Sequence, residues 1–256
     1  MKCSNLIEAF EQLAPLHMAQ AWDNIGMLVG TAQREINSIY IALDSTDEVI
    51  KDATNKKVDL LLTHHPLIFK SLKSVTEEEF IGRRITNLIK ANITYYAMHT
   101  NFDVAVMADL AADYLCLSNR EILEKTDDSH GIGKIGMLPK AMTLDELCQY
   151  VKSVFAIESL KVFGNRADQV EKVVIMPGSG KSYIKNTIQS QAQVMITGDI
   201  DHHEGLDALA CGLNIIDAGH YGIEHIFVKY MQEYINNSFS EIKVFTEKVN
   251  APFEIV

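Results

Sequence analysis

The sequence predicts an α/β protein made of two α/β domains, each with a mixed sheet flanked by helices. Two observations support this fold class. Short apolar runs of strand length alternate with segments of helical length along the chain. Several of these runs are followed directly by polar motifs containing His, Asp or Glu, and open α/β sheets place functional groups beyond the carboxyl ends of their strands.

The first predicted domain covers residues 1–123. Its elements alternate as expected of repeated strand–helix units. The N-terminal segment is amphipathic, which predicts that the chain begins with a helix. In chain order we expect a helix at 5–13, a strand at 39–43, a helix at 47–56, a strand at 58–62, a helix at 77–91, a strand at 93–98 and a helix at 106–117.

The second predicted domain covers residues 124–245 and follows a polar segment, 124–131, that is interpreted as a linker because it ends in glycine. Residues 246–256 are interpreted as a C-terminal strand that could return to the first domain, since 242–245 and 249–253 alternate like edge strands. Within the second domain we expect strands at 133–138, 160–163, 170–176, 194–197 and 215–217, and helices at 144–155 and 183–191.

Composition narrows the function classes. The 34 acidic residues outnumber the 23 basic ones, and the net charge of -11 opposes non-specific binding to nucleic acid. The four cysteines are far apart and form no Cys-x-x-Cys pair, which argues against a thiolate metal site or a disulfide framework. The N-terminus does not resemble a secretory signal and no apolar run reaches membrane-spanning length, so we expect a cytoplasmic protein.

Three motifs that follow strand-like runs predict a metal site. They are Thr63-His64-His65-Pro66, His99-Thr100-Asn101-Phe102-Asp103 and Gly219-His220-Tyr221-Gly222-Ile223-Glu224. Imidazole and carboxylate suit zinc, iron, cobalt or manganese, and the three motifs together offer more donors than one ion needs. We therefore expect two divalent ions, held in the cleft between the domains.

Individual residues in these motifs have alternative interpretations. His220 and Glu224 share one face if a helix begins after Ala218. Asp103 could bridge two ions or cap a helix, and His99 could be a ligand, a general base or a partner that orients Asp103. A second pair, His202-His203, opens a predicted helix, so at most one of them faces inward, and His203 is the better candidate.

The chain resembles the GTP cyclohydrolase I type 2 family, also called NIF-three-like or dinuclear metal centre proteins, over nearly its whole length. Besides the three motifs, Trp22-Asp23-Asn24-Ile25-Gly26 and Ala42-Leu43-Asp44 carry this resemblance. At 256 residues the chain is similar to the short form without an inserted domain. The resemblance implies a toroidal homohexamer and two metal ions bound by His64, His65, Asp103, His220 and Glu224, with His99 close by.

Lys134 stands where the family usually has Arg, which replaces a planar, bidentate anion contact by a point charge. The segment Trp22-Asp23-Asn24 is interpreted as a loop that is fixed by packing of the Trp and by hydrogen bonds from Asp or Asn to backbone.

A dinuclear site favours hydrolysis, in which a metal-bridging hydroxide attacks an electrophile that one ion polarises. His99 or Glu224 could then move a proton, so both are candidate catalytic residues. The resemblance implies opening of the GTP imidazole ring, but such a cluster also serves phosphoesters, amides and cyclic amidines. We therefore expect a metal-dependent hydrolase acting on a nucleotide or other small anionic substrate. The alternatives are a non-enzymatic, metal-binding hexameric scaffold or regulatory protein and, less favoured by charge, a metallonuclease.

Overall fold

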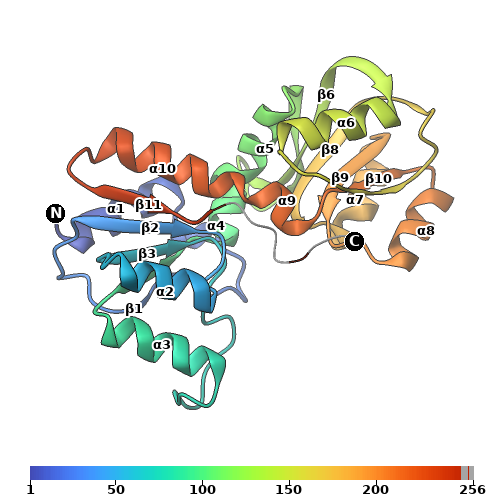
Figure 1. Cartoon of the computed structure of the whole chain (residues 1–256). Coiled ribbons are helices and arrows are strands. Elements are labelled where there is room, and N and C mark those ends of the chain that lie inside the picture. The colour runs from blue at the N-terminus through green and yellow to red at the C-terminus, as the bar shows by residue number, and fades with distance from the viewer. Residues whose placement is uncertain (249–252, 254–256) are drawn as a thin grey trace. The chain divides into compact units, whose positions relative to one another are not determined.

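A computed structural model describes residues 1–248 and 253, and the chain divides into two compact units (Figure 1). The first unit combines residues 1–102 with 227–248, and the second comprises residues 103–226. Each unit has a mixed sheet flanked by helices, so the predicted fold class is confirmed. In the described part of the chain, no helix is both long enough and apolar enough to cross a membrane.

The first unit is built on a five-stranded sheet with the order β1-β4-β3-β2-β11. The four strands from β4 to β11 run parallel, and β1 pairs with β4 in the antiparallel sense. The register aligns Ala42 with Thr63 and Thr63 with Ala97, so β2, β3 and β4 end at the same edge. The bounds are β1 Gly26–Val29, β2 Ser38–Ala42, β3 Leu60–Thr63, β4 Thr94–Ala97 and β11 Lys243–Thr246.

Helices cover both faces of this sheet, as the alternation of its side chains requires. Tyr95 belongs to an apolar cluster that includes α2 and α3, whereas its neighbour Tyr96 points to the other face and contacts Phe10 of α1, with ring centroids 5.4 Å apart. Figure 1 shows α2 and α3 on one side of the strands and α10 on the other. The helices are α1 Cys3–Leu13, α2 Asp47–Asn55, α3 Phe80–Lys90, the short α4 Thr100–Phe102 and α10 Ile226–Ser238, with a 3-10 turn η1 at Leu16–Met18.

The second unit is built on a six-stranded sheet with the order β5-β6-β8-β9-β10-β7. Strands β8, β9 and β10 run parallel, and the other pairs are antiparallel. The strands are β5 Ser118–Lys125, β6 Gly131–Thr143, β7 Lys161–Phe163, β8 Gln169–Ser179, β9 Val194–Gly198 and β10 Asn214–Asp217. The helices are a π-helix η2 Asp103–Met107, α5 Ala108–Tyr114, α6 Leu144–Val154, the 3-10 turn η3 Lys181–Tyr183, α7 Ile184–Gln189, α8 His202–Ala210 and α9 His220–Glu224.

The unit boundaries differ from the predicted domain boundaries at residues 123 and 245. The predicted linker at 124–131 is a hairpin turn, because Lys125 pairs with Gly131 and the backbone amide of Thr126 donates to the carbonyl of His130. A polar run that ends in glycine is typical of both a linker and a turn. At the other end, β11 pairs with β2, which assigns residues 243–246 to the first sheet. The predicted strand at 249–253 lies outside the described residues apart from Phe253.

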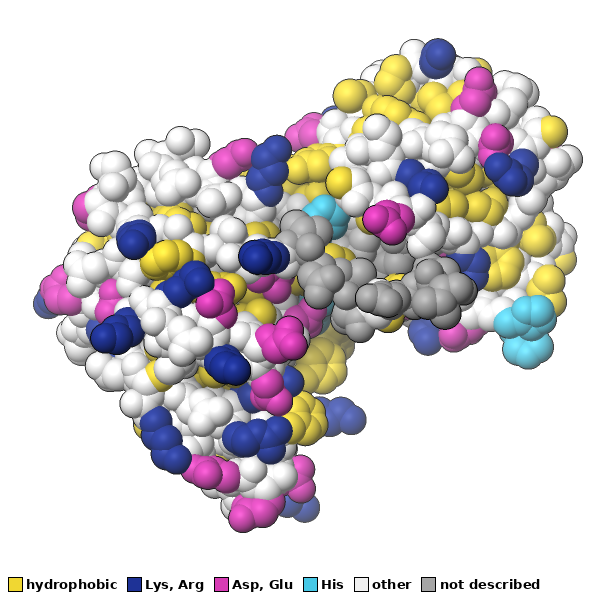
Figure 2. All heavy atoms as spheres, in the orientation of Figure 1, with side chains coloured by type: hydrophobic (Ala, Val, Ile, Leu, Met, Phe, Trp, Pro, Cys, Tyr) yellow, Lys and Arg dark blue, Asp and Glu magenta, His cyan; other side chains and the backbone are white. Residues whose placement is uncertain are grey.

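Charged side chains of both signs are interspersed over the face of the molecule that Figure 2 shows. Hydrophobic side chains occupy parts of the same face between them. That face therefore presents mixed charge to solvent.

Candidate metal centre

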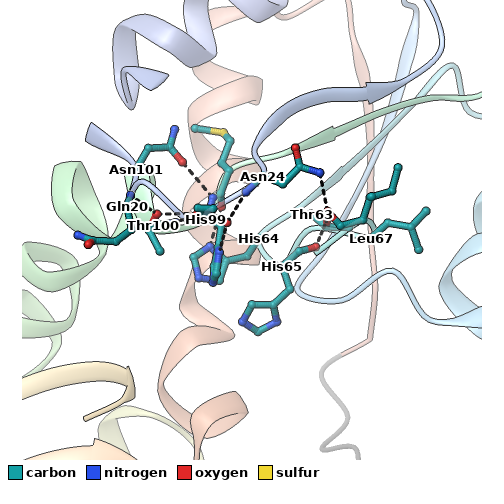
Figure 3. Close-up of polar contacts among 12 residues, drawn as sticks. Gln20, Asn24, Thr63, His64, His65, Leu67, His99, Thr100 and Asn101 are labelled. Carbon is teal, nitrogen blue, oxygen red and sulfur yellow. Dashed lines mark hydrogen bonds and ion pairs between the residues drawn. The ribbon is translucent and has the colours of Figure 1, made fainter. Parts of the chain in front are cut away.

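Three imidazoles meet at the edge of the first sheet where β3 and β4 end (Figure 3). His64 and His65 follow β3 and His99 follows β4, and one ligand nitrogen from each lies within 4.8 Å of the others. Their ring centroids are 4.9 Å apart for His64 and His65, 5.3 Å for His64 and His99, and 5.5 Å for His65 and His99. The parallel register brings these residues together, as the position of the motifs after strands predicted.

Each of these three rings has its Nδ1 atom held by an oxygen acceptor. The Nδ1 of His64 lies 2.7 Å from the carbonyl oxygen of Met98, that of His65 lies 2.8 Å from Oδ1 of Asp44, and that of His99 lies 2.9 Å from Oδ1 of Asp23. A carbonyl or a carboxylate can only accept, so Nδ1 carries the proton. In this tautomer the neutral ring has its lone pair on Nε2, so Nε2 is the atom that can bind a metal ion.

The turn that carries His65 is fixed by the buried hydroxyl of Tyr95. This hydroxyl accepts from the amide of Leu67 at 2.8 Å and lies 3.0 Å from the carbonyl oxygen of His65 and 2.5 Å from Oγ1 of Thr63. Burial raises the pKa of Tyr95 to about 12, so the hydroxyl is neutral at physiological pH. A rigid turn of this kind lets two adjacent histidines keep defined positions.

Asp23 ties the loop before β1 to the His99 motif. Besides His99, its carboxylate accepts from the amide of Asn24 at 2.8 Å, the amide of Thr100 at 3.0 Å and the hydroxyl of Thr100 at 2.6 Å. Burial alone would raise the pKa of Asp23, but the hydrogen bonds from His99 and Thr100 lower it to about 2. The predicted backbone bonding by Asp or Asn is therefore confirmed, whereas Trp22 remains 58% exposed although its ring contacts Phe69 and His99.

In the second unit, helix α9 places His220 and Glu224 on one face, as their spacing predicted. The Nε2 of His220 lies 3.0 Å from Oε2 of Glu224, and its Nδ1 lies 2.7 Å from Oδ2 of Asp199. A carboxylate oxygen facing a ring nitrogen at this distance needs a proton or a cation between them. A nitrogen and a buried carboxylate are also the donor types that divalent zinc, iron or manganese accepts, so the residues present fit a metal ion.

The backbone of β8 closes in on this pair at Gly178. Its φ of +72° is in the left-handed region, and a Cβ added there would lie 2.5 Å from Oε1 of Glu224 and 3.6 Å from Nε2 of His220. The backbone conformation therefore favours glycine at this position, and a side chain there would displace the Glu224 carboxylate.

Asp103 begins the π-helix η2, which continues α4. Its negative charge affects Tyr183. The pKa of the Tyr183 hydroxyl is raised mainly by burial and then by the charges of Glu124 and Asp103. π-Helical turns inside α-helices are frequent at functional sites because they shift the side chains that follow. The observed helical segment of η2 and α5 begins at Asp103, three residues before the predicted start at residue 106.

Three residues that sequence analysis singled out do not join either set of donors. His202 and His203 open α8 and are both exposed, so neither of them, including the better candidate His203, faces inward in the described chain. Lys134 forms an ion pair with Asp109 at 3.0 Å.

Sequence analysis did not predict that Asp44 and Asp199 would hold the Nδ1 atoms of His65 and His220. Asp44 follows β2 and Asp199 follows β9, so the position after a strand, which identified the histidines, is also the signal for these acids. Asp199 has a φ of 58°, a left-handed conformation that Asp tolerates better than most residues.

The chain is similar to known proteins over its whole length. A protein from Clostridium perfringens described as "GTP cyclohydrolase 1 type 2 homolog" is 32% identical over 262 residues, which covers 100% of both chains. One of the same description from Streptococcus pneumoniae is 35% identical over 235 residues, covering 90% of this chain and 88% of the relative. The crystal structure of a Bacillus cereus protein related to NIF3 superposes with a TM-score of 0.91 at 25% identity, covering 100% of this chain and 99% of the other.

The family match extends over almost the whole sequence. Residues 1–252 match the profile of Duf34/NIF3 (NGG1p interacting factor 3), which agrees with the resemblance found in the motifs. The chain is therefore a member of the Duf34/NIF3 family.

Proposed function

We propose that this protein is a metal-dependent hydrolase that binds two divalent ions per chain through His64, His65, Asp103, His220 and Glu224. The observation that carries the proposal is the state of the imidazoles. The Nδ1 atoms of His64, His65 and His220 each face an oxygen acceptor, which orients Nε2 as a ligand and raises its basicity. Zinc, iron, manganese and cobalt all suit this mixture of nitrogen and carboxylate donors.

Bound divalent ions supply two things to hydrolysis, a lowered pKa of water and polarisation of the electrophile. The chain itself supplies groups that can move a proton. His99 is held by the Asp23 carboxylate, which orients the ring so that its Nε2 can take part in proton transfer. Glu224, which is 2% exposed, is the second candidate for this role.

The relatives' description supports a GTP cyclohydrolase type 2-like reaction, but the proposed substrate class is wider. We propose a nucleotide or another small anionic molecule, with hydrolysis of a cyclic amidine, an amide or a phosphoester as the reaction. We further propose that the protein acts in the cytoplasm as a homohexamer.

Metal content per chain is the test of this proposal. Protein purified without chelator or affinity histidines should contain about two ions per chain by elemental analysis, and both His64→Ala and Glu224→Ala should contain fewer. His130→Ala is the matched control, because His130 also pairs with an aspartate, Asp127, but lies on the exposed hairpin turn. A wild-type chain that binds no metal after reconstitution would refute the proposal.

Activity then separates a hydrolase from a scaffold. Metal-loaded protein is screened for hydrolysis of nucleotides and phosphoesters. His65→Ala should abolish hydrolysis of any compound that the wild type hydrolyses, while its circular dichroism and oligomeric state stay unchanged. Metal binding without turnover of any substrate in such a screen would favour the non-enzymatic alternative.

A further inference from the structure

Two exposed aromatic side chains lie beside His99. Trp22 is 58% exposed and Phe69 is 51% exposed, and their ring centroids are 5.5 Å apart with the ring planes inclined at 49°. The centroid of the His99 ring is 5.9 Å from that of Trp22 and 6.3 Å from that of Phe69. Large aromatic side chains are usually mostly buried, so an exposed pair next to a cluster of imidazoles calls for an explanation.

The backbone that presents this pair is held in place by hydrogen bonds. The Asp23 carboxylate anchors the residue after Trp22 to His99 and Thr100, and the amide of Gln20 donates to the Thr100 hydroxyl at 2.9 Å. The side-chain amide of Asn24 donates to the carbonyl of Ile68 at 2.5 Å, which ties this loop to the segment that carries Phe69. Figure 3 shows Gln20 and Asn24 beside His99 and Thr100. Both rings are therefore presented by ordered backbone.

We propose that Trp22 and Phe69 bind a planar heteroaromatic ring of the substrate, such as a nucleobase, and so place it beside His99. This inference rests on the proposed hydrolase function and narrows its substrate class to molecules with such a ring. Aromatic faces stack on any base, and two inclined rings offer one stacked and one edge contact. Because hydrogen bonds already hold the backbone that carries both rings, binding loses little backbone entropy.

The chain provides its own reporter for this contact, because Trp22 is its only tryptophan. The experiment uses full-length protein loaded with zinc, which does not quench fluorescence by paramagnetism. Guanosine 5′-monophosphate and ribose 5-phosphate are the two probes, since they share the sugar and the phosphate and differ in the base. Affinity is measured by calorimetry, and stacking is measured as quenching of Trp22 fluorescence, with N-acetyltryptophanamide correcting for absorption by guanine.

We expect guanosine monophosphate to quench the fluorescence saturably and ribose 5-phosphate to leave it unchanged. Phe69→Leu should weaken binding of the nucleotide by about 5-fold to 150-fold, the loss of one stacked base, and should leave both ribose 5-phosphate affinity and zinc content unchanged. Phe80→Leu is the matched control, because Phe80 is 53% exposed and belongs to α3. It should behave as wild type.

The other outcomes separate this inference from the proposed function. Equal affinity for both probes without quenching, in protein that holds zinc, would overturn the aromatic site and leave the metal site standing. Quenching by the nucleotide in protein that cannot be loaded with zinc would support the aromatic site and refute the metal-dependent hydrolase. A blue shift of Trp22 emission that grows with protein concentration, without any probe, would mean that a second copy covers the pair and would overturn the inference.

Discussion

Replacement of Asp23 by asparagine tests whether a single buried carboxylate holds the His99 motif together. The side chain of Asp23 is 0% exposed and accepts four hydrogen bonds, from Asn24, His99 and both the amide and hydroxyl of Thr100. Asparagine has nearly the same shape but only one oxygen acceptor, and its amide group would face the Thr100 amide, donor to donor. The change therefore removes charge and acceptors without creating a cavity.

The expected cost follows from the pKa of the carboxyl group. Its pKa falls from the ordinary value of 3.8 to about 2 in the folded chain. One pKa unit corresponds to about 1.4 kcal/mol, so ionised Asp23 stabilises the folded state by about 2 kcal/mol at neutral pH. A depressed carboxyl pKa gives stability that is complete above 3.8 and is lost as the pH falls through 2, so the cost of the substitution should shrink by about 1 kcal/mol between pH 5 and pH 3.

Urea unfolding of metal-free protein measures this cost. Trp22 fluorescence reports the first unit, and circular dichroism follows both units, so unfolding in separate steps would be visible. Asp47→Asn is the matched control, since Asp47 also has a lowered pKa, from its hydrogen bond with Arg84, but is 56% exposed. The control should lose less than about 1 kcal/mol.

A loss for Asp23→Asn that equals the loss for Asp47→Asn, or that does not change between pH 5 and pH 3, would refute the reasoning. The first result would mean that the hydrogen bonds of Asp23 contribute no more than an exposed ion pair. The second would mean that the lowered pKa is not the source of the stability.

Three further substitutions test other parts of the two units. Glu247→Gln should stabilise metal-free protein by an amount that grows above pH 4.5 and levels off above pH 7. Burial raises the pKa of Glu247 to about 7, so ionisation of its carboxyl group opposes folding. Urea unfolding midpoints across this pH range measure the gain in stability. Gly178→Ala should lower zinc affinity, measured by competition with a coloured chelator, because the added Cβ would lie 2.5 Å from Oε1 of Glu224. Gly212→Ala is the control, since Gly212 has a φ of +79° but no atom within 4 Å of the added Cβ. It should cause backbone strain and leave zinc affinity unchanged. In the same assay Asp199→Asn should weaken zinc binding by about 10-fold to 100-fold and Asp127→Asn should not.

Three parallel strands of the first unit, β2, β3 and β4, were predictable because each is a short and almost entirely buried run. Strands β2, β3 and β4 lie within or overlap the predicted ranges 39–43, 58–62 and 93–98. Strand β5 was not predicted, since its residues are mostly polar and its burial is only partial. Helix α10 was also missed, although Phe227, Met231 and Ile235 have the spacing of one buried helix face.

Domain boundaries were less predictable than strands because they depend on pairing between distant segments. Strand β11 joins β2 across about 200 residues, and the apolar pattern of residues 243–246 contains no information about which sheet it will join. The hairpin turn at 124–131 has the composition of a linker, and only the pairing of its flanking strands distinguishes the two.

The histidines were predictable from their position after strands, but their partners were not. His99 and Asp23 are 76 residues apart, and His65 and Asp44 are 21 apart. The sequence shows that imidazoles are present at one edge of the sheet. The choice of acceptor, and therefore the ring tautomer, is settled only by the folded chain.

Under the proposed function, the carboxylates that orient the imidazoles would also set the order in which metal ions and an anionic substrate bind. Asp23 and Asp44 contact His99 and His65 in the first unit, and Asp199 and Glu224 contact His220 in the second. These acids favour a cation and repel an anion at each set of histidines, in a chain whose net charge is already -11. We therefore expect an anionic substrate to be attracted only once bound divalent ions have reversed the local charge. Metal binding is thus expected to precede substrate binding, and chelation should abolish the affinity for an anionic probe even where the fold persists.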